Sequence, residues 1–404
     1  MALLRVSRRE WAALVGAAMI AAAAPAWAQD VYRVGALNPV TGAGSTYGSG
    51  MQKSIYAAVA EVNAAGGAGG RRFEALAEDT QTSPEPAVLA AKKLIEVNKA
   101  SAILGTWSSS VSLAIQPLTQ GSNTILMHTS SAPTLFSQNV RNLGWGFQSG
   151  SKYNGRAMNA AVKNEGFKRP AIMAFNNDAA VGNVNAFKSA YEAEGGKIVA
   201  SVVYEPKRTS YRSELEKVVA ANPDVIALSG YLPDTTIILR EAYELGVNAK
   251  FIIPGWAAGP QLLQALGPEV SEGVLVYESV PDANSAAFKR YSEAYQKALG
   301  SSGEDNVFAA QAYDMVISLA LAMEKAGPGS DNLAIAKEIR TVSSPDGQKV
   351  TSFAEGKKLL QAGQKINYEG ASGPLDFDED GNAVAIFAVS AITKGKYVRS
   401  YVLN

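Results

Sequence analysis

Three consecutive serines, Ser108, Ser109 and Ser110, and the single histidine of the chain, His128, are the residues whose types could support nucleophilic catalysis. A serine hydroxyl becomes a useful nucleophile only beside a base, commonly a histidine that a carboxylate orients. No carboxylate accompanies His128 in its own segment, and the G-x-S-x-G turn of many hydrolases is absent. We therefore interpret His128 as a polar loop residue near a cleft. An exported hydrolase that uses Ser109 and His128 is the alternative.

Metal and cofactor chemistry is disfavoured by what the sequence lacks. Cysteine is absent, which excludes disulfides, thiolate metal sites and a cysteine nucleophile, and one histidine removes most transition-metal sites. Gly42-x-Gly44 is followed by Gly48, one position too late for a dinucleotide-binding fingerprint, and no phosphate-binding P-loop occurs. The acidic turn from Asp376 to Gly381 lacks the closing glutamate of a calcium loop. We expect no metal, no cofactor and no enzymatic activity.

Charge and length narrow the class of protein further. The 404 residues include 37 Lys+Arg and 37 Asp+Glu, so the formal net charge is zero. This balance argues against a nucleic-acid partner, because nucleic-acid binding requires an excess of basic residues at the phosphates. A chain of this length with 47% hydrophobic residues can bury a core, and it is typical of two domains.

Four loops rich in Gly, Ser, Thr, Asn or Asp are the candidate binding loops: 38–48, 105–110, 128–133 and 176–182. Each of them follows a run that reads as a strand. In open α/β sheets, ligands bind beyond the carboxyl ends of the strands and at helix N-termini. We therefore expect these loops to meet at one site, where free N–H groups and hydroxyls would suit an anion or a carboxylate.

Strand-like and helical runs alternate along the chain, which predicts βαβ units and parallel sheets. The expected strands are 31–37, 73–77, 102–104, 124–127, 171–175, 197–204, 225–228, 251–253 and 274–277. The expected helices are 51–63, 84–97, 108–118, 183–194, 210–221, 233–245, 260–266, 286–299, 307–326 and 333–342. Two similar series, near 30–148 and 149–278, predict two lobes. The stretch after 278 shows helices without a matching set of strands, so we expect it to complete an existing lobe.

The first 28 residues read as a secretory signal. Arg5, Arg8 and Arg9 form a positive start, an apolar run covers 12–24, and a small-x-small site precedes Gln29. We expect cleavage after Ala28 and a periplasmic mature protein. The adjacent arginines leave the general-secretion and twin-arginine routes both open. No later segment reads as a membrane span free of charges.

Several stretches, in order along the chain, resemble one family. They are 34–42 with Tyr47-Gly48, 62–67, 78–84, 103–105 leading into Ser108-Ser109, 221–225 leading into Gly230-Tyr231, and 373–378 with Gly381. Together these motifs resemble the solute-binding proteins of branched-chain amino-acid-type ABC transporters, the type I periplasmic-binding family. The resemblance covers nearly the whole mature chain.

The resemblance implies an α/β fold of two Rossmann-like lobes with parallel sheets joined by a three-strand hinge. It places 29–148 plus 279–381 in the N-terminal lobe and 149–278 plus 382–404 in the C-terminal lobe. The implied function is the capture of a small carboxylate-bearing solute, an amino acid or an aromatic or apolar acid, by hinge closure. The implied partner is the membrane permease of an ABC importer, and we expect a monomer. A ligand-sensing module for a membrane receptor is the alternative.

The resemblance also supplies candidate ligand-binding residues. It points to hydroxyls that would bind a carboxylate and to aromatic side chains that would line the cleft: Tyr47, Ser108, Ser109, Ser130, Ser131, Tyr231 and Phe308. Trp107 and Trp256 flank the predicted cleft. Simpler interpretations remain open, with Tyr231 and Phe308 as interlobe packing and Ser109 as a helix N-cap.

Two departures from the family pattern bear on the ligand. Amino-acid binders of the family carry an acid after the strand that ends at Ile253, whereas this chain has Pro254-Gly255-Trp256. The tyrosine expected just before Gly182 is also missing. A buried ammonium without a counter-charge is costly. We therefore expect an aromatic or apolar acid, unless Asp178 supplies the negative charge.

Overall fold

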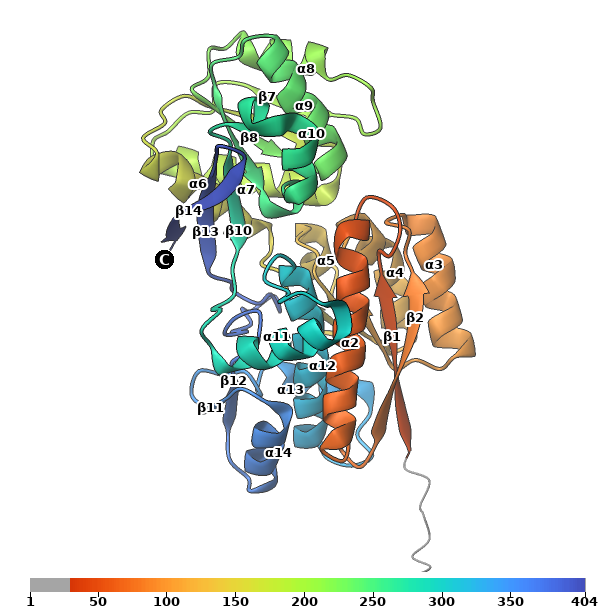
Figure 1. Ribbon diagram of the computed structural model, residues 1–404. Coiled ribbons are helices and arrows are strands. Elements are labelled where there is room, and N and C mark those ends of the chain that lie inside the picture. Colours follow the sequence, from red (N-terminus) through yellow and green to blue (C-terminus); the bar gives the residue numbers. More distant parts are fainter. Residues whose placement is uncertain (1–29, 404) are drawn as a thin grey trace, which may run out of the picture.

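The computed structural model describes residues 30–403, which form two lobes joined by connecting segments (Figure 1). Each lobe is built on a sheet of mainly parallel strands covered by helices, so the predicted α/β class with two lobes is confirmed. The predicted signal peptide (1–28), its twin-arginine or general-secretion character and the cleavage site after Ala28 lie outside the described residues.

The first lobe contains a five-stranded parallel sheet of order β2-β1-β3-β4-β5. Its strands are β1 (Val31–Asn38), β2 (Arg72–Asp79), β3 (Ala102–Gly105), β4 (Ile125–His128) and β5 (Gly144–Gly146). Its connecting helices are α2 (Ser45–Ala64), α3 (Pro84–Lys92, continued by a π-helical turn Lys93–Val97), α4 (Ser109–Gly121) and α5 (Pro133–Ser137). Since β1 lies between β2 and β3, the loops that follow β1 and β3 diverge at the carboxyl edge, which is where ligands bind in such sheets.

The second lobe contains a seven-stranded sheet of order β14-β13-β10-β9-β8-β6-β7. Its parallel strands are β6 (Pro170–Phe175), β7 (Ser201–Tyr204), β8 (Val225–Ser229), β9 (Lys250–Pro254) and β10 (Leu275–Ser279). Its helices are α6 (Ser151–Asn164), α7 (Asp178–Ala193), α8 (Arg212–Val219), α9 (Leu232–Glu244) and α10 (Pro260–Ser271), with a short 3₁₀ turn at Gly255–Ala257. Two antiparallel strands, β13 (Phe387–Thr393) and β14 (Lys396–Leu403), extend the sheet beside β10.

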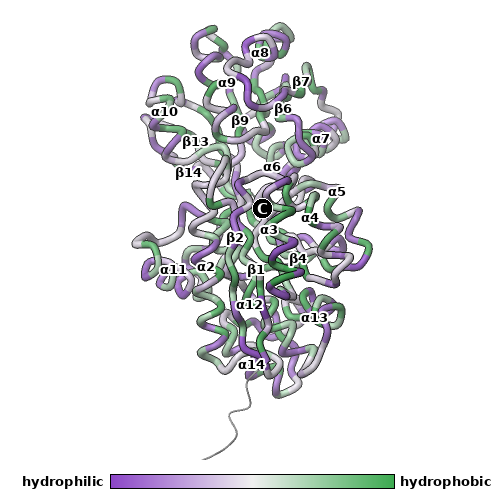
Figure 2. Tube along the Cα trace, turned by 90° about the vertical axis from the view of Figure 1, so that its right-hand side faces the viewer, coloured by the Kyte–Doolittle hydropathy of each residue, from purple (hydrophilic) through white to green (hydrophobic). Residues whose placement is uncertain are grey.

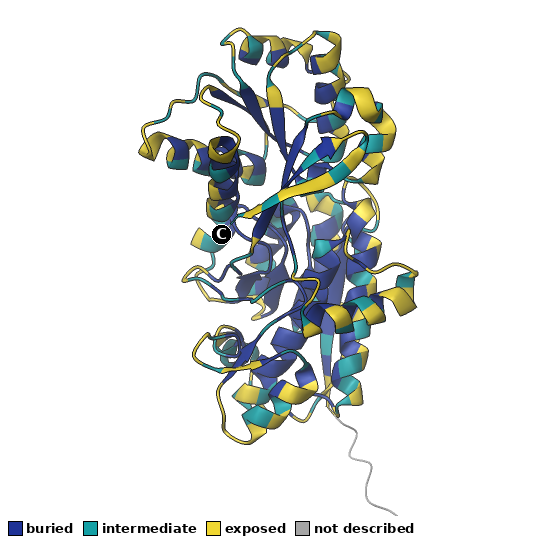
Figure 3. Ribbon diagram, turned by 60° about the vertical axis from the view of Figure 1, so that its left-hand side comes forward, coloured by how far each residue is buried: buried dark blue, intermediate teal, exposed yellow. Residues whose placement is uncertain are grey.

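Both faces of each sheet are buried, as alternate residues of the strands show. On β6, Ala171 and Met173 pack with α8, α9 and α10, whereas Ile172 and Ala174 pack with α6 and α7. Figure 3 shows the central strands buried between helices whose outer faces are exposed. Figure 2 shows hydrophobic residues along the segments in the interior of both lobes. Continuous apolar strands of this kind are typical of parallel sheets covered on both sides.

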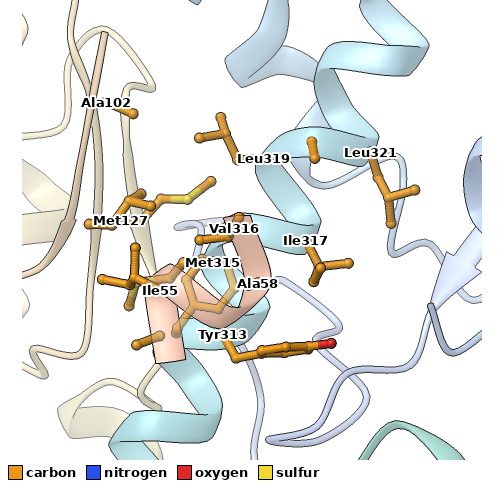
Figure 4. Packing of buried hydrophobic residues seen from close by; sticks show 14 of the residues in the cluster. Ile55, Ala58, Ala102, Met127, Tyr313, Met315, Val316, Ile317, Leu319 and Leu321 are labelled. Carbon is orange, nitrogen blue, oxygen red and sulfur yellow. The ribbon is translucent and has the colours of Figure 1, made fainter. Parts of the chain in front are cut away.

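The segment after β10 mostly completes the first lobe. It contains α11 (Ala286–Leu299), α12 (Val307–Ala326), α13 (Asn332–Ile339) and α14 (Phe353–Gln361), with a small sheet of β11 (Gln348–Val350) and β12 (Ile366–Tyr368). Figure 4 shows Val316 and Leu319 of α12 near Ile55 of α2 and Met127 of β4. This part of the chain therefore joins the first hydrophobic core, as we expected.

Helix α12 is long and apolar enough to cross a membrane by length and composition alone. In the most apolar 18-residue stretch of this helix, 89% is buried inside the protein. The carboxylate in the middle of the helix, Asp314, is fully buried and hydrogen-bonded. It is therefore the central core helix of the first lobe.

Three connecting segments run side by side between the lobes. Ser149, after β5, donates a hydrogen bond to the carbonyl oxygen of Ala383 (3.0 Å) and accepts one from the N–H of Ala385 (2.8 Å). Ser279, at the end of β10, donates to Oε1 of Gln148 (3.2 Å). These bonds tie the three segments together. The lobe boundaries near 148, 279 and 382 stay a prediction.

Two expectations from the sequence differ from the structure. Helices α2 and α7 begin at Ser45 and Asp178, earlier than the predicted 51 and 183, because their polar first turns read as loop. The stretch after 278 contains strands that the sequence pattern did not identify, since β13 and β14 join the second sheet. Strands β11 and β12 escape a pattern search because each has three residues.

Candidate functional site between the lobes

A cavity of about 420 Å³ lies between the lobes at the carboxyl ends of the strands. We call it the first chamber. Its first-lobe and hinge lining is Trp107, Ser109, Thr129, Ser130, Ser131, Gln148 and Phe308. Its second-lobe lining is Asn177, Ala179, Ala180, Asn183, Ser229, Gly230, Tyr231 and Trp256. Among residues 30–403, no Asp, Glu, Lys, Arg or His side chain lines this chamber. The chamber thus offers neutral donors and acceptors between aromatic walls.

Ser109 stands at the first turn of α4, directly after the loop that follows β3. Its Oγ accepts hydrogen bonds from the N–H groups of Ser131 (3.2 Å) and Ala132 (3.3 Å). The Ser109 hydroxyl therefore joins two loops while its own proton has no acceptor within the described chain. Ser108 occupies the N-cap position without a side-chain capping bond, and its Oγ lies 2.9 Å from Oγ of Ser110.

The loop after β4 forms the adjacent wall. Oγ of Ser130 donates to the carbonyl oxygen of Thr106 (2.9 Å) and lies 2.7 Å from Oγ of Ser112, so this hydroxyl holds the loop in place. Oγ1 of Thr129 is buried and has no hydrogen-bond partner in the described part of the chain. A residue with an unpaired buried hydroxyl is therefore part of the chamber wall.

His128 is buried beneath this wall and does not act with Ser109. Its Nδ1 accepts a hydrogen bond from the N–H of Ser130 (3.2 Å), and burial lowers the pKa of His128 to about 4. A neutral imidazole bonded in this way fixes the loop. Within residues 30–403 no hydrogen bond joins Ser109 to His128, so the geometry offers no nucleophile–base pair of the kind that the hydrolase alternative requires.

Helix α7 supplies the opposing wall of the second lobe. Asn177 caps it, with Oδ1 accepting from the N–H of Ala180 (2.7 Å) and Nδ2 donating to the Tyr231 hydroxyl (3.2 Å). One turn further, the Asn183 side chain is fully buried, and neither its Nδ2 nor its Oδ1 has a partner in the part of the chain that the structure describes. A buried amide without partners costs folding free energy unless something else binds it.

The turn after β8 brings Ser229, Gly230 and Tyr231 to the chamber. Oγ of Ser229 is buried and unpartnered among residues 30–403. A Cβ on Gly230 would lie 2.2 Å from Oδ2 of Asp234, so only glycine fits there. The Asp234 carboxylate accepts a hydrogen bond from the N–H of Tyr231 (3.1 Å) and from the Tyr204 hydroxyl. Burial raises the pKa of Asp234 to about 6.

Aromatic rings connect the two lobes across the chamber. The Trp107 ring lies 5.4 Å from the Tyr231 ring between centroids, and also contacts Phe308 at 5.9 Å and Tyr47 at 5.7 Å. Burial raises the pKa of Tyr231, and hydrogen bonds with Ser108 and Asn177 offset part of that increase. Trp256 donates from Nε1 to the carbonyl oxygen of Gly230 (3.1 Å), which fixes its ring at the second-lobe wall.

The structure brings most of the predicted site residues together. Trp107, Ser109, Ser130, Ser131, Tyr231, Trp256 and Phe308 line the first chamber. Tyr47 lies behind them, against the rings of Trp107 and Phe308. Ser108 forms a side-chain hydrogen bond with Tyr231. Asp178 is exposed and does not line the chamber, whereas its neighbours Asn177 and Ala179 do.

Sequence reasoning missed Thr129, Gln148, Asn177, Asn183 and Ser229. Asn183 could have been identified from helical spacing, because it precedes Phe187 by four residues and so lies on the apolar face of α7. A polar residue on such a face is a candidate for a site. For Gln148 and Ser229 the sequence offered no comparable pattern.

Comparisons with known proteins agree with this geometry. The family model for periplasmic binding proteins matches residues 31–396. A Leu/Ile/Val-binding protein of Rhizobium johnstonii is 25% identical over 344 residues, which are 85% of this chain and 88% of the relative. A leucine-binding protein of Thermotoga maritima superposes with a TM-score of 0.78 at 26% identity, covering 92% of this chain and 99% of that one.

A solute-binding protein of an ABC transporter from Rhodopseudomonas palustris, solved with 3,4-dihydroxybenzoic acid, shares the fold at 19% identity. The TM-score is 0.71, with coverage of 93% of this chain and 98% of that one. The family model spans nearly all of the described residues, and the resemblance predicted from the sequence is confirmed. The chain belongs to the periplasmic binding proteins, and within them it is similar to the Leu/Ile/Val- and leucine-binding proteins.

Proposed function

We propose that the chain is the exported solute-binding component of an ABC importer, and that it captures a small carboxylate-bearing solute between its lobes. The observation that carries this proposal is the first chamber, in which buried polar atoms of Asn183, Thr129 and Ser229 lack protein partners between aromatic walls. Each unpaired buried group costs about 1–3 kcal/mol of folding free energy, and three residues with such groups surround this one cavity. A bound solute that hydrogen-bonds them would offset this cost.

A carboxylate suits the polar end of the chamber. Helix α4 begins at the wall residue Ser109, and α7 and α9 begin directly after the wall residues Asn177 and Tyr231. Free N–H groups at helix N-termini favour negative charge. The available Ser109 hydroxyl proton adds a donor. The rings of Trp107, Trp256 and Phe308 supply apolar surface for the rest of the solute. An amino acid or an aromatic or apolar acid has this combination of groups.

Closure of the two lobes around the solute is part of the proposal. The loops of one lobe already contact the helices of the other, since the Ser151 hydroxyl donates to the carbonyl oxygen of Ser131 (2.8 Å). A Cβ on Gly182 would lie 2.7 Å from Cδ of Pro133, so glycine permits this approach. Segments tied at Gln148 and Ser149 can act as a hinge that lets the lobes open and close.

The remaining parts of the proposal draw on the resemblance to the family and, for the mature N-terminus, on the signal-like pattern of the first 28 residues. We place the lobe boundaries near 148, 279 and 382, the mature N-terminus after Ala28, and the protein in the periplasm as a monomer. The closed form would deliver its solute to the membrane permease of the importer, and the protein itself would catalyse nothing.

A ligand screen tests this function directly. Mature protein is heated with amino acids, aromatic acids, apolar acids, amides and dicarboxylates, and the hits are titrated by calorimetry. We expect carboxylates to raise the melting temperature, because a ligand that binds only the folded state stabilises it. Ser109→Ala should weaken the binding of a carboxylate by about 1–3 kcal/mol, since one hydrogen bond to a charged group is lost.

Three results would speak against the proposal. They are the absence of any carboxylate hit, an unchanged affinity in Ser109→Ala, and turnover of a compound by the purified protein. Ser137→Ala is the matched control, because its exposed hydroxyl donates only to the carbonyl oxygen of Thr134 (3.2 Å), outside the chamber.

A further inference from the structure

A second chamber adjoins the first one on the hinge side. It comprises about 530 Å³ of empty space, part of it open to solvent. It shares Gln148, Trp256 and Phe308 with the first chamber, so these three side chains form the boundary between them. Unlike the first chamber, it is lined by charged side chains. The cleft therefore has a neutral half and a charged half.

Glu278, near the end of β10, is the central charged group of the second chamber. Its side chain is partly buried, yet no hydrogen bond or ion pair with it is found within residues 30–403. A Cβ on Gly255 would lie 2.7 Å from Oε2 of Glu278, so the carboxylate occupies the space beside the turn after β9. Burial raises the pKa of Glu278, with Asp305 adding to the shift and Arg399 opposing it.

The Tyr47 hydroxyl is an independent feature that points to a ligand. The Tyr47 side chain is 9% exposed, lines the second chamber, and has no hydrogen-bond partner in the described part of the chain. Its ring is held in place by Trp107 and Phe308. The negative charge of Glu278 contributes to the raised pKa of Tyr47, so the two groups act on each other across the chamber. The Tyr47 residue is thus largely buried, while its hydroxyl is left to bond a group that enters the chamber.

The charges that line the second chamber sum to a negative value. Glu304 and Asp305 add two exposed carboxylates to Glu278, whereas Arg399 is the one cation that lines it among the described residues. Arg399 is exposed and forms no ion pair with Glu278 in that part of the chain. The field in the chamber therefore favours a positively charged group.

We infer that the second chamber, with Glu278 as its anionic group and Tyr47 as a hydrogen-bonding partner, binds the cationic end of a solute whose carboxylate lies in the first chamber. This inference rests on the proposed function. The solute is then a two-ended molecule in which a spacer separates the carboxylate from the cation and passes between Trp256 and Phe308. An α-amino acid, with both charges on one carbon, would not reach both chambers.

Three acids of nearly equal size test this arrangement by calorimetry. They are 4-(aminomethyl)benzoate, its isomer phenylglycine, and 4-methylbenzoate, which keeps the carboxylate and ring but has no ammonium. We expect 4-(aminomethyl)benzoate to bind about 10- to 100-fold more tightly than either of the others, the range expected for a hydrogen bond between charged groups. The aliphatic set 6-aminohexanoate, norleucine and hexanoate repeats the test with a flexible spacer.

Glu278→Gln identifies the group that is responsible. It should remove the advantage of 4-(aminomethyl)benzoate over 4-methylbenzoate without weakening the binding of 4-methylbenzoate, which has no cation for Glu278 to bind. Glu192→Gln, an exposed acid of α7 that lines neither chamber, is the matched control. Melting curves of both variants show whether they fold. If Glu278→Gln does not fold, Tyr47→Phe measures the same difference between the two ligands and should reduce it.

The outcomes separate this inference from the proposed function. Tight binding of 4-methylbenzoate with no gain from the aminomethyl group, or an unchanged gain in Glu278→Gln, overturns the inference and leaves the proposed function standing. A preference for phenylglycine over 4-(aminomethyl)benzoate overturns it as well. A failure of every carboxylate to bind overturns both.

Discussion

Two fully buried polar side chains, Asp314 in the core of the first lobe and Asn183 in the cleft, differ in their hydrogen bonding. The Asp314 carboxylate, in the middle of α12, accepts hydrogen bonds from the Tyr368 hydroxyl (2.8 Å) and the N–H of Ala371 (2.9 Å). It also accepts from both the N–H (2.7 Å) and the hydroxyl (2.6 Å) of Ser372. In the first chamber, the equally buried Asn183 amide has no partner in the described residues.

At these two residues, the difference distinguishes a group that builds the scaffold from one that is available to a solute. An unpartnered buried group destabilises the folded state, whereas a fully paired one fixes a single arrangement. The scaffold group should therefore matter for stability and not for binding, and the chamber group should show the reverse. Substitutions in the two regions test this comparison.

Asp314→Ala should have the largest effect on stability. It leaves four buried donors without their acceptor, and we expect the free energy of unfolding to fall by about 3–5 kcal/mol. Urea denaturation monitored by circular dichroism measures the loss. Asp346→Asn, at an exposed acid paired with Lys365, is the control and should leave the urea midpoint unchanged. A small loss in Asp314→Ala would mean that the core tolerates unpaired groups as the chamber does.

His128 lies beneath the wall of the first chamber, where its Nδ1 accepts a hydrogen bond from the N–H of Ser130. Substituting it tests whether this wall contributes to folding stability. Burial holds its folded-state pKa at about 4, below the value of 6.5 in an unfolded chain. The unfolded state therefore binds a proton first as the pH falls. The stability from the neutral imidazole is fully present above pH 6.5 and is lost as the pH falls through 4, a change of about 3 kcal/mol.

The measurement is the free energy of unfolding between pH 4 and pH 7.5 for the unmodified protein and for His128→Asn. The variant should be less stable at neutral pH and should lose a large part of the pH dependence in this window. Since His128 is the one histidine of the chain, no other imidazole contributes. An identical pH dependence in the two proteins would show that His128 is protonated or exposed in solution.

Much of the fold could be predicted from the sequence, because burial on both faces makes strands such as β6 and β8 continuous apolar runs. The start of α7 could not, since Asn177 and Asp178 read equally well as loop. Only the bond from the N–H of Ala180 to Oδ1 of Asn177 decides that Asn177 is the cap. Strand β13 was missed because its partner in the sheet, β10, lies more than 100 residues away in the sequence, so local pattern carries little of this pairing. Strand β14 joins the sheet only through β13.

The candidate site divides in the same way. Ser109 and Tyr231 could be predicted, since each stands in a short motif directly after a strand. Glu278 could not be predicted, because its place beside Gly255 follows from the parallel pairing of β9 with β10 rather than from its neighbours in the chain. The choice of Asp178 over Asn177 as a site residue illustrates how a shift of one position moves a side chain from the chamber to the surface.

Asn183→Leu has the smallest expected effect on stability and is the sharpest test of the comparison. Replacing an unpartnered amide by an apolar group of similar size should raise the unfolding free energy of the ligand-free protein by about 1–2 kcal/mol, while weakening carboxylate binding about 10- to 100-fold. The matched control is Asn159→Leu on α6, where Nδ2 of the buried amide donates to Glu194 (3.0 Å) outside the chamber. That variant should lose stability and keep its affinity. If Asn183→Leu instead lost stability as Asn159→Leu does, Asn183 would belong to the scaffold, and the contrast between core and cleft would fail at its most buried residue.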